Sequence, residues 1–198
     1  MTGQAGTVRL RPALLADRER TWRWAADSDA TSSMMGPPHF PDHPVMTLAE
    51  FERDYTDSFF APEGDGYGRM FIVLEGDREV GCVSYDGLED WHGIAELDAW
   101  IASSADQGRG IGSRAVGGLG AMLFEQAGVE ALLVRPSARN VRAVAAYRRA
   151  GFVPAEECVP PIPDSVLATG NDYADAVALV RVRRSAASRP STSRAATR

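Results

Sequence analysis

The chain has 198 residues, of which 44% are hydrophobic and 24% charged, a composition that is ordinary for a globular protein with one sizeable core. Its formal net charge is −6, and all 21 basic residues are arginines. Because nucleic-acid backbones are held by basic faces, this balance argues against a nucleic-acid partner, whereas it permits a cationic substrate.

Signals for membranes, secretion and metals are weak throughout the sequence. No apolar run approaches the roughly 20 residues that cross a bilayer, and residues 1–10 lack the apolar stretch of a signal peptide. Cys82 and Cys158 form no CxxC pair, and the histidines have no spacing typical of a metal site. We therefore expect a cytoplasmic protein with no membrane partner, no disulfide framework and no metal.

The first third of the chain predicts a strand followed by two helices. Residues 7–13 alternate in the manner of an edge strand, and residues 14–27 carry apolar side chains at helical spacing. Four prolines exclude regular structure from residues 34–44. A second helix is expected to begin at Thr47, because Glu50 completes a capping box with it.

The remainder predicts strands that alternate with helices. Residues 68–87 read as a hairpin turning at Gly76 and Asp77. The further expected elements are strands at 93–103, 130–136 and 175–183 and helices at 113–128 and 140–152. We predict an α/β (α+β) fold with a mixed sheet of six to seven strands flanked by about four helices. It occupies a single domain at residues 1–184, followed by a disordered basic tail at 185–198.

The stretch "ADQGRGIGSRAVGGL" at residues 105–119 places glycines where a helix starts. A strand that runs through a glycine-rich turn into a helix directs backbone N–H groups at an anion. A P-loop is excluded because the chain has no lysine, and a dinucleotide fingerprint would need glycine where Ser113 stands. The spacing that matches is Q-x-x-G-x-G at Gln107, Gly110 and Gly112. A helix start that merely needs tight turns is the alternative.

These residues resemble the pyrophosphate loop [QR]-x-x-G-x-[GA] of the GNAT N-acetyltransferases. A second signature of that family, N-x-x-A-x-x-x-Y-x-x-x-G-F, is similar to the stretch that begins at Asn140 and ends at Phe152. The resemblance covers residues 7–184, and its opening segment looks like the branch that contains ribosomal-protein and aminoglycoside 6′-N-acetyltransferases. The family's fold and its acetyl-CoA chemistry are what this resemblance implies.

The resemblance assigns acetyl-CoA, as co-substrate, to the glycine loop and the following helix. Arg109 is equally readable as a solvated loop charge, and Asn140 as a simple helix cap. The implied cofactor-binding residues are Ile101, Gln107, Gly108, Arg109, Gly110, Ile111, Gly112, Ser113, Asn140, Ala143 and Tyr147.

Three residues are candidates for moving protons. Tyr147 stands where the family often places a general acid for the departing thiolate, although it could also simply anchor its helix. Asp98 and Glu96 lie two residues apart, hence on one face of a strand, and either could assist loss of the amine proton. Asp98 ranks first, because its distance from the loop resembles that of the aspartate in aminoglycoside 6′-N-acetyltransferases. A solvated sheet face and a bound water as base remain the alternatives.

The acceptor is read least well from the sequence. The expected substrate-binding residues are Trp22, Asp27, Asp86, Trp91 and Asp98, although the tryptophans are also ordinary core residues. Direct transfer to a primary amine of an aminoglycoside-like or other small cationic molecule is the leading hypothesis. A peptide N-terminus is the alternative acceptor, and a CoA-binding domain without turnover is the alternative class. Residues 158–175 are long for a connection and are expected to contribute to the acceptor site or a dimer contact, so both a monomer and a homodimer are open.

Overall fold

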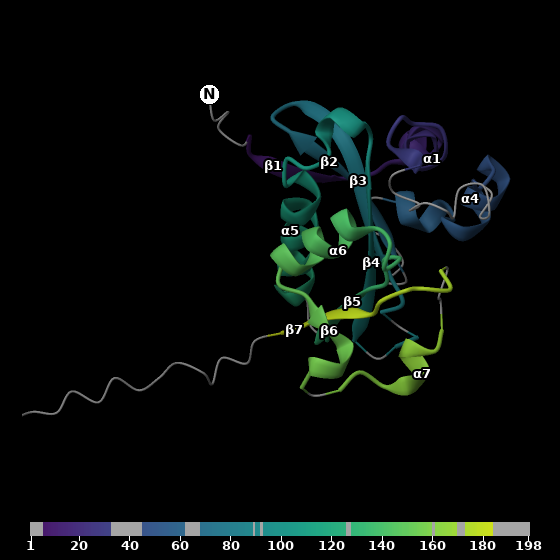
Figure 1. Cartoon of the computed structure of the whole chain (residues 1–198). Helices are drawn as coiled ribbons and strands as arrows, with labels where there is room; N and C mark the ends of the chain where they lie inside the picture. The colour runs from purple at the N-terminus through teal and green to yellow at the C-terminus, as the bar shows by residue number, and fades with distance from the viewer. Residues whose placement is uncertain are drawn as a thin grey trace, which may run out of the picture.

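A seven-stranded sheet with the order β1-β2-β3-β4-β5-β7-β6 forms the centre of the molecule (Figure 1). The computed structural model describes residues 6–32, 45–61, 68–88, 90–91, 93–125, 128–159, 161–169 and 173–183. Neighbouring strands are antiparallel except β4 and β5, which are parallel. The strands are β1 (Val8–Pro12), β2 (Arg69–Glu75), β3 (Arg78–Asp86), β4 (Ile94–Ile101), β5 (Ala131–Val134), β6 (Val153–Pro154) and β7 (Leu179–Val182).

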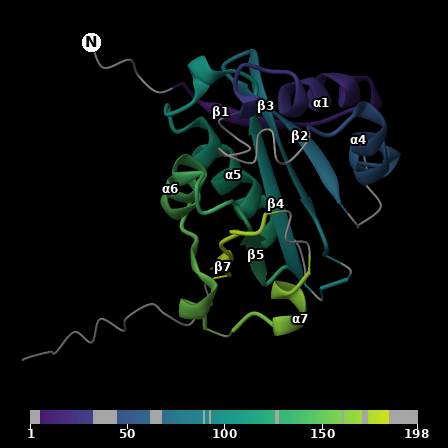
Figure 2. The same ribbon diagram turned by 45° about the vertical axis from the view of Figure 1, so that its right-hand side comes forward.

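Four helices of seven or more residues occur in the described part of the chain, which confirms the predicted mixed α/β fold. Figures 1 and 2 show α5 and α6 on one side of the sheet and α1 and α4, with the short α7, on the other. The helices are α1 (Arg18–Ala26), α4 (Leu48–Asp54), α5 (Ile111–Glu125), α6 (Val141–Arg149) and α7 (Asp164–Leu167).

The alternating strands give each face of the sheet its own apolar cluster. On one face Leu97 of β4 packs in a buried cluster with Leu119 of α5. On the other face Ile72 of β2 packs in a second cluster with Phe51 of α4. Because successive side chains of a strand point to opposite faces, the residues of β4 between its apolar positions face the α1 and α4 side.

The two parallel strands stay together over only three residues. Pairing runs from Ile94 opposite Ala131 to Glu96 opposite Leu133, yet β4 continues to Ile101. The sheet therefore opens beyond Glu96, at the carboxyl ends of both strands. In open sheets this edge is where ligands bind.

Several sequence predictions are confirmed in detail, and others needed correction. The capping box holds, since Thr47 Oγ1 accepts from the Glu50 amide at 3.3 Å and Glu50 Oε2 accepts from the Thr47 amide at 2.7 Å. The strand predicted at residues 175–183 is shorter in the structure. Only Leu179–Val182, which form β7, pair with β5. The sequence also did not indicate β6 or α7, which are too short to show a period. Residues 34–44 and the tail at 185–198 lie outside the described residues.

A buried carboxylate ties β1 to the turn before α1. Asp17 accepts from Arg11 Nη1 at 2.7 Å and from the Leu14 amide at 2.9 Å, and it also pairs with Arg20. Burial alone would raise the pKa of Asp17, but the Arg11 hydrogen bond and the Leu14 amide outweigh it and lower that pKa to about 2. A carboxyl group with a lowered pKa stabilises the fold above its unfolded pKa and loses this effect as the pH falls toward its folded pKa.

We expect Asp17→Asn to lower the free energy of unfolding by about 2 kcal/mol at pH 7. The wild type should lose this contribution between about pH 4 and pH 2, and the variant should lack that part of the acid transition. Urea unfolding at pH 7, 4 and 3 measures both effects. Asp77→Asn, which removes the fully exposed partner of Arg9, is the control and should change little. Equal stability of Asp17→Asn and wild type at pH 7 contradicts the prediction.

Candidate active site

A glycine-rich turn connects β4 to α5 at the point where the sheet opens. Gly108 and Gly110 both have φ of +73°, a backbone conformation that residues with a Cβ rarely adopt. The Arg114 amide donates to the Gly110 carbonyl at 3.1 Å, which begins the hydrogen-bonding pattern of α5. The amides of Ile111 to Ser113 form the first turn of the helix, where N–H groups have no acceptor within the helix and the helix dipole is positive. The turn therefore presents backbone donors to an anion.

Arginine–carboxylate pairs fix this loop to the β2–β3 hairpin. The buried Asp106 carboxylate accepts from Arg78 at 2.6 and 2.7 Å and from Arg109 Nη1 at 2.7 Å. The Arg78 hydrogen bonds hold the pKa of Asp106 below its usual range despite burial. Arg109 also contacts Glu75, with Nη2 2.9 Å from Oε2. Arg109 thus points to the hairpin and anchors the loop.

A cavity of about 360 Å³ lies between the loop and α6. Asn140 caps α6, since its side chain accepts from the Ala143 amide at 3.1 Å. Arg142 Nη1 donates to the Gln107 side chain at 2.8 Å and so joins the two walls. Nine of the eleven expected cofactor-binding residues line this cavity, namely Ile101, Gln107, Gly108, Gly110, Ile111, Gly112, Ser113, Asn140 and Ala143; Arg109 and Tyr147 do not.

Tyr147 is buried on α6 with its ring against Phe152, the ring centroids being 6.0 Å apart. Burial raises the pKa of the Tyr147 phenol well above its usual range, and the charge of Asp98 acts in the same direction. A raised pKa keeps the proton on this phenol at neutral pH.

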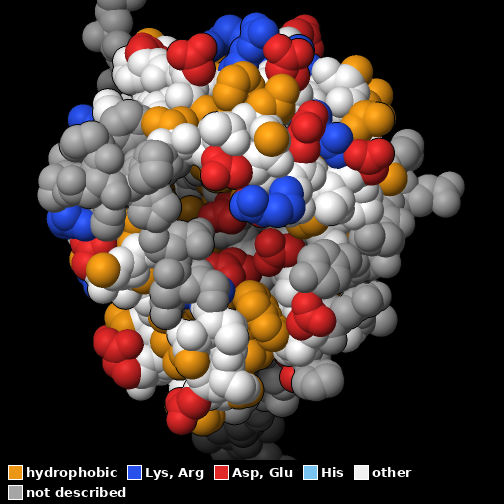
Figure 3. Space-filling model, turned by 90° about the vertical axis from the view of Figure 1, so that its right-hand side faces the viewer, with side chains coloured by type: hydrophobic (Ala, Val, Ile, Leu, Met, Phe, Trp, Pro, Cys, Tyr) orange, Lys and Arg blue, Asp and Glu red, His pale blue; other side chains and the backbone are white. Residues whose placement is uncertain are grey.

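The two carboxylates of β4 have different surroundings. Asp98 is exposed, and the Tyr55 hydroxyl donates to its Oδ2 at 3.5 Å. Glu96 forms an ion pair with Arg135, whose Nε donates to Glu96 Oε1 at 2.8 Å. Asp86 is the cross-strand neighbour of Glu96 and shares its face. Figure 3 looks onto the side of α1, α4 and α7 and shows Asp and Glu side chains gathered in a hollow near its centre.

The remaining expected acceptor residues are spread over this side of the molecule. Trp91 packs with the cluster that includes α7, and its ring lies where a Cβ on Gly87 would approach it to 2.5 Å. Trp22 packs against the α1–α4 cluster and donates its indole N–H to the Met46 carbonyl at 2.9 Å. Asp27 caps the C-terminus of α1. Of the two expected tryptophans, Trp91 is the one that contacts Arg135, the partner of Glu96 on β4.

Sequence reasoning missed Tyr55 and Arg135. Nothing in the sequence distinguishes Tyr55, which ends α4 far from β4 along the chain. Arg135 did carry a signal, because it follows the apolar strand β5 directly, and a cation in such a place needs a buried partner.

Neither a cluster suited to a metal ion nor a helix suited to a membrane span occurs among the described residues. No group of three or more His, Cys, Asp or Glu side chains among them is arranged to hold a metal ion. None of the described helices has the length and hydropathy of a membrane span.

A mixed sheet that opens between two parallel strands, with a glycine turn and a helix N-terminus at the opening, defines the class of α/β folds that bind an anionic ligand at the sheet edge. Residues 7–153 match the family model described as an acetyltransferase (GNAT) domain. The chain therefore belongs to the GNAT acetyltransferase family.

Curated relatives include the aminoglycoside N(6′)-acetyltransferase type 1 of Klebsiella pneumoniae, which is 29% identical over 115 residues, 54% of this chain and 56% of that protein. A kanamycin resistance protein of Rhizobium radiobacter is 33% identical over 60 residues, 30% of this chain and 56% of that protein. The chain thus spans about half the length of the curated relatives it matches.

Solved structures share the fold over most of the chain. Aminoglycoside acetyltransferase AAC(6′)-Ib in complex with paromomycin and acetyl-CoA has a TM-score of 0.66 at 22% identity, covering 89% of this chain and 94% of that one. A spermidine N-acetyltransferase of Vibrio cholerae with CoA and spermine has a TM-score of 0.62 at 18% identity, covering 88% and 95%. The ribosomal L7/L12 α-N-protein acetyltransferase RimL with CoA has a TM-score of 0.63 at 17% identity, covering 89% and 94%.

The glycines of the loop and of α5 should respond in opposite ways to substitution by alanine. Gly110→Ala places a Cβ at positive φ and should lower the free energy of unfolding by about 1–2 kcal/mol. Gly118→Ala, at an exposed position of α5 where a Cβ meets nothing within 4 Å, should raise it by about 0.5–1 kcal/mol. Urea unfolding of both variants measures the difference. A Gly110→Ala variant as stable as the wild type rules out the conformational role of Gly110.

Proposed function

We propose that the protein is an acetyl-CoA-dependent N-acetyltransferase that moves an acetyl group directly to a primary amine of a small cationic acceptor. The observation that carries the proposal is that one strand, β4, brings two features to the sheet opening. It carries Asp98 on the face of α1 and α4, and its end leads into the glycine turn before α5. Tyr147 lies on α6, the helix that lines the cavity on the side opposite this turn, and both its burial and the charge of Asp98 raise its pKa. A proton acceptor, a proton donor and an anion cradle thus converge on one opening.

The residues of the loop fit the pyrophosphate of acetyl-CoA. Gly108, Gly110 and Gly112 all line the cavity, and because glycine has no side chain a ligand can approach their backbone closely. The amides of Gly108 to Gly112 and the Ser113 region would hold the diphosphate, whereas the Gln107 amide already donates to the Ser104 carbonyl at 3.2 Å. The cavity along α6 would take the arm that follows it. When bound, acetyl-CoA supplies an activated acetyl group as a thioester.

Asp98 is the group that we assign to the amine. A protonated amine must lose a proton before it can attack, and a carboxylate within hydrogen-bond reach, or one linked to it by a water, can accept that proton. Glu96 is already paired with Arg135, whereas Asp98 is exposed and oriented by the Tyr55 hydroxyl. Asp98 therefore serves both to attract the ammonium group and to accept its proton.

Tyr147 is the group that we assign to the departing sulfur. Its phenol carries a proton over the whole neutral range, as a general acid must, whereas the raised pKa itself makes it a weaker donor. Neither cysteine is suited to a covalent step, because burial raises the pKa of both Cys82 and Cys158 and disfavours their thiolates. Direct transfer from donor to acceptor is the mechanism that these groups support.

The acceptor class follows from charge. The acidic hollow of Figure 3 favours cationic amines over neutral ones. The named acceptors and ligands of relatives and neighbours, aminoglycosides and spermine, are of this kind. The fold likeness to RimL supports a peptide N-terminus as the second candidate.

The proposal is tested by following release of CoA thiol from acetyl-CoA with a panel of kanamycin, spermidine and short peptides with a free N-terminus. We expect turnover with at least one polycationic amine and slower turnover with the peptides. Tight binding of acetyl-CoA without turnover of any amine would instead identify a CoA-binding domain.

The roles of the two proton-handling residues predict the effects of conservative substitutions. Asp98→Asn and Tyr147→Phe should each lower kcat by roughly 10²–10⁴-fold, the usual contribution of general acid–base catalysis. Affinity for coenzyme A, measured by calorimetry, should stay at the wild-type value. Asp77→Asn, in the exposed turn of the β2–β3 hairpin, is the matched control for the loss of one negative charge. Wild-type kcat in either active-site variant removes that residue from the mechanism.

A further inference from the structure

Arg135 is the most deeply buried charged side chain of the ion pairs in the described residues, with 3% of its side chain exposed. It stands directly after β5, on the opposite side of the sheet opening from Asp98. A buried guanidinium is costly unless all its donors are used, so its partners show what it holds together.

Those partners come from three elements of the acceptor side. The guanidinium pairs with the carboxylate of Glu96 on β4. Its Nη1 donates to the carbonyl of Val166, at 3.2 Å, and to the carbonyl of Thr169, both at the end of α7. Its Cζ lies 5.5 Å from the centroid of the Trp91 ring, a cation–π contact. One side chain therefore connects β4, the β3–β4 connection and the α7 segment.

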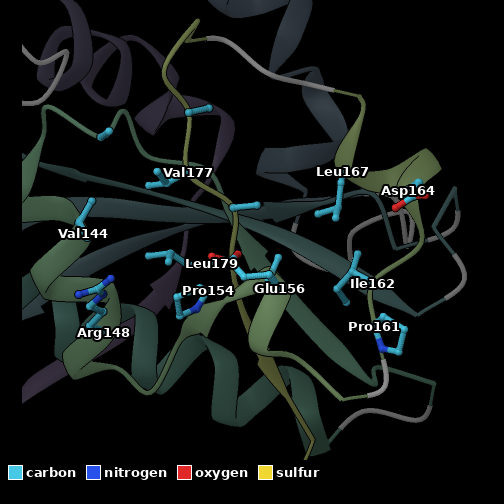
Figure 4. Close-up of a pocket in the computed structure, with 14 residues that line it drawn as sticks. Val144, Arg148, Pro154, Glu156, Pro161, Ile162, Asp164, Leu167, Val177 and Leu179 are labelled. Atoms are coloured by element: carbon cyan, nitrogen blue, oxygen red, sulfur yellow. The ribbon is translucent and has the colours of Figure 1, made fainter.

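The α7 segment depends on such a connection. A helix of four residues does not stabilise itself. One side of the segment lines a cavity of about 680 Å³, and Figure 4 shows Ile162 and Leu167 across this cavity from Val144 and Arg148 of α6. On that side the segment lacks close packing against α6. Burial of Val166 and the hydrogen bonds from Arg135 hold its other side.

We propose that Arg135 is a positioning residue for the acceptor amine, because it fixes the end of α7 and the Trp91 ring against Glu96 of β4, two residues before Asp98. The inference rests on the proposed function, since it assigns this side of the opening to the acceptor. Arg135 also neutralises Glu96, the other carboxylate of β4 on the face of Asp98. The donor side is unaffected, because the glycine loop is fixed separately through Asp106.

Arg135→Lys is the sharpest test. Lysine keeps the positive charge opposite Glu96 but replaces a planar fork with one ammonium group, which cannot serve the carboxylate and both carbonyls in the same geometry. We expect faster amide hydrogen exchange at residues 164–169 and a KM for the amine raised by about tenfold or more. The KM for acetyl-CoA should stay within about twofold of wild type, since its cradle is anchored elsewhere.

Arg11→Lys is the matched control, because the Arg11 guanidinium also bridges two groups, the carboxylates of Asp17 and Glu79, at the far edge of the sheet. It should lower stability without changing either KM. Arg135→Met extends the series by removing the charge as well, and its exchange rates should exceed those of Arg135→Lys.

Two results overturn the inference: wild-type hydrogen exchange at residues 164–169 in Arg135→Lys, or faster exchange with an unchanged amine KM. Failure of the proposed function has a different signature, namely that the wild type itself acetylates no amine of the panel. The exchange measurement then still decides whether Arg135 holds α7.

Discussion

The structure depends on the short register between β4 and β5. Three paired residues are enough to keep the strands in one sheet, and the divergence beyond Glu96 leaves the sheet open at its centre. Asp98, the glycine turn and Arg135 all lie at that opening. Asp98 extends from β4 past the last pair, the glycine turn follows the end of β4, and Arg135 follows the end of β5.

Charge pairing follows one pattern through the molecule. The carboxylates of Asp17, Glu96 and Asp106 are largely buried, and each pairs with at least one arginine that also contacts a second group. Since a buried unpaired charge is strongly unfavourable, these pairs fix loops at defined places. Asp98 differs in being exposed, with a tyrosine hydroxyl as its hydrogen-bond donor. This contrast separates the carboxylates that hold the fold from the one that we assign to catalysis.

The donor side of the site could be predicted from sequence, and the acceptor side only in part. Gln107 to Ser113 and Asn140 to Tyr147 are two short stretches in which spacing alone reports the local structure, so the loop and the helix that form the cavity were both expected. Tyr55 contacts Asp98 and Arg135 contacts Glu96, at separations of 43 and 39 residues along the chain. No periodic pattern in the sequence encodes such contacts. Glu96 shows how far prediction from sequence reaches. Its two-residue spacing from Asp98 can be read from the sequence, whereas its ion pair with Arg135 cannot.

The hydrogen bonds of Arg135 to Val166 and Thr169 close chain segments of more than thirty residues. Closing a long segment costs configurational entropy that local contacts do not, so elements joined in this way form late in folding and open early in local unfolding. The donor cradle carries contacts of similar span, since Asp106 pairs with Arg78 across 28 residues and Gln107 accepts from Arg142 across 35. The two halves of the site therefore differ in how they are held: two arginines converge on the Asp106 carboxylate at the cradle, whereas the Arg135 guanidinium reaches the α7 end on the acceptor side.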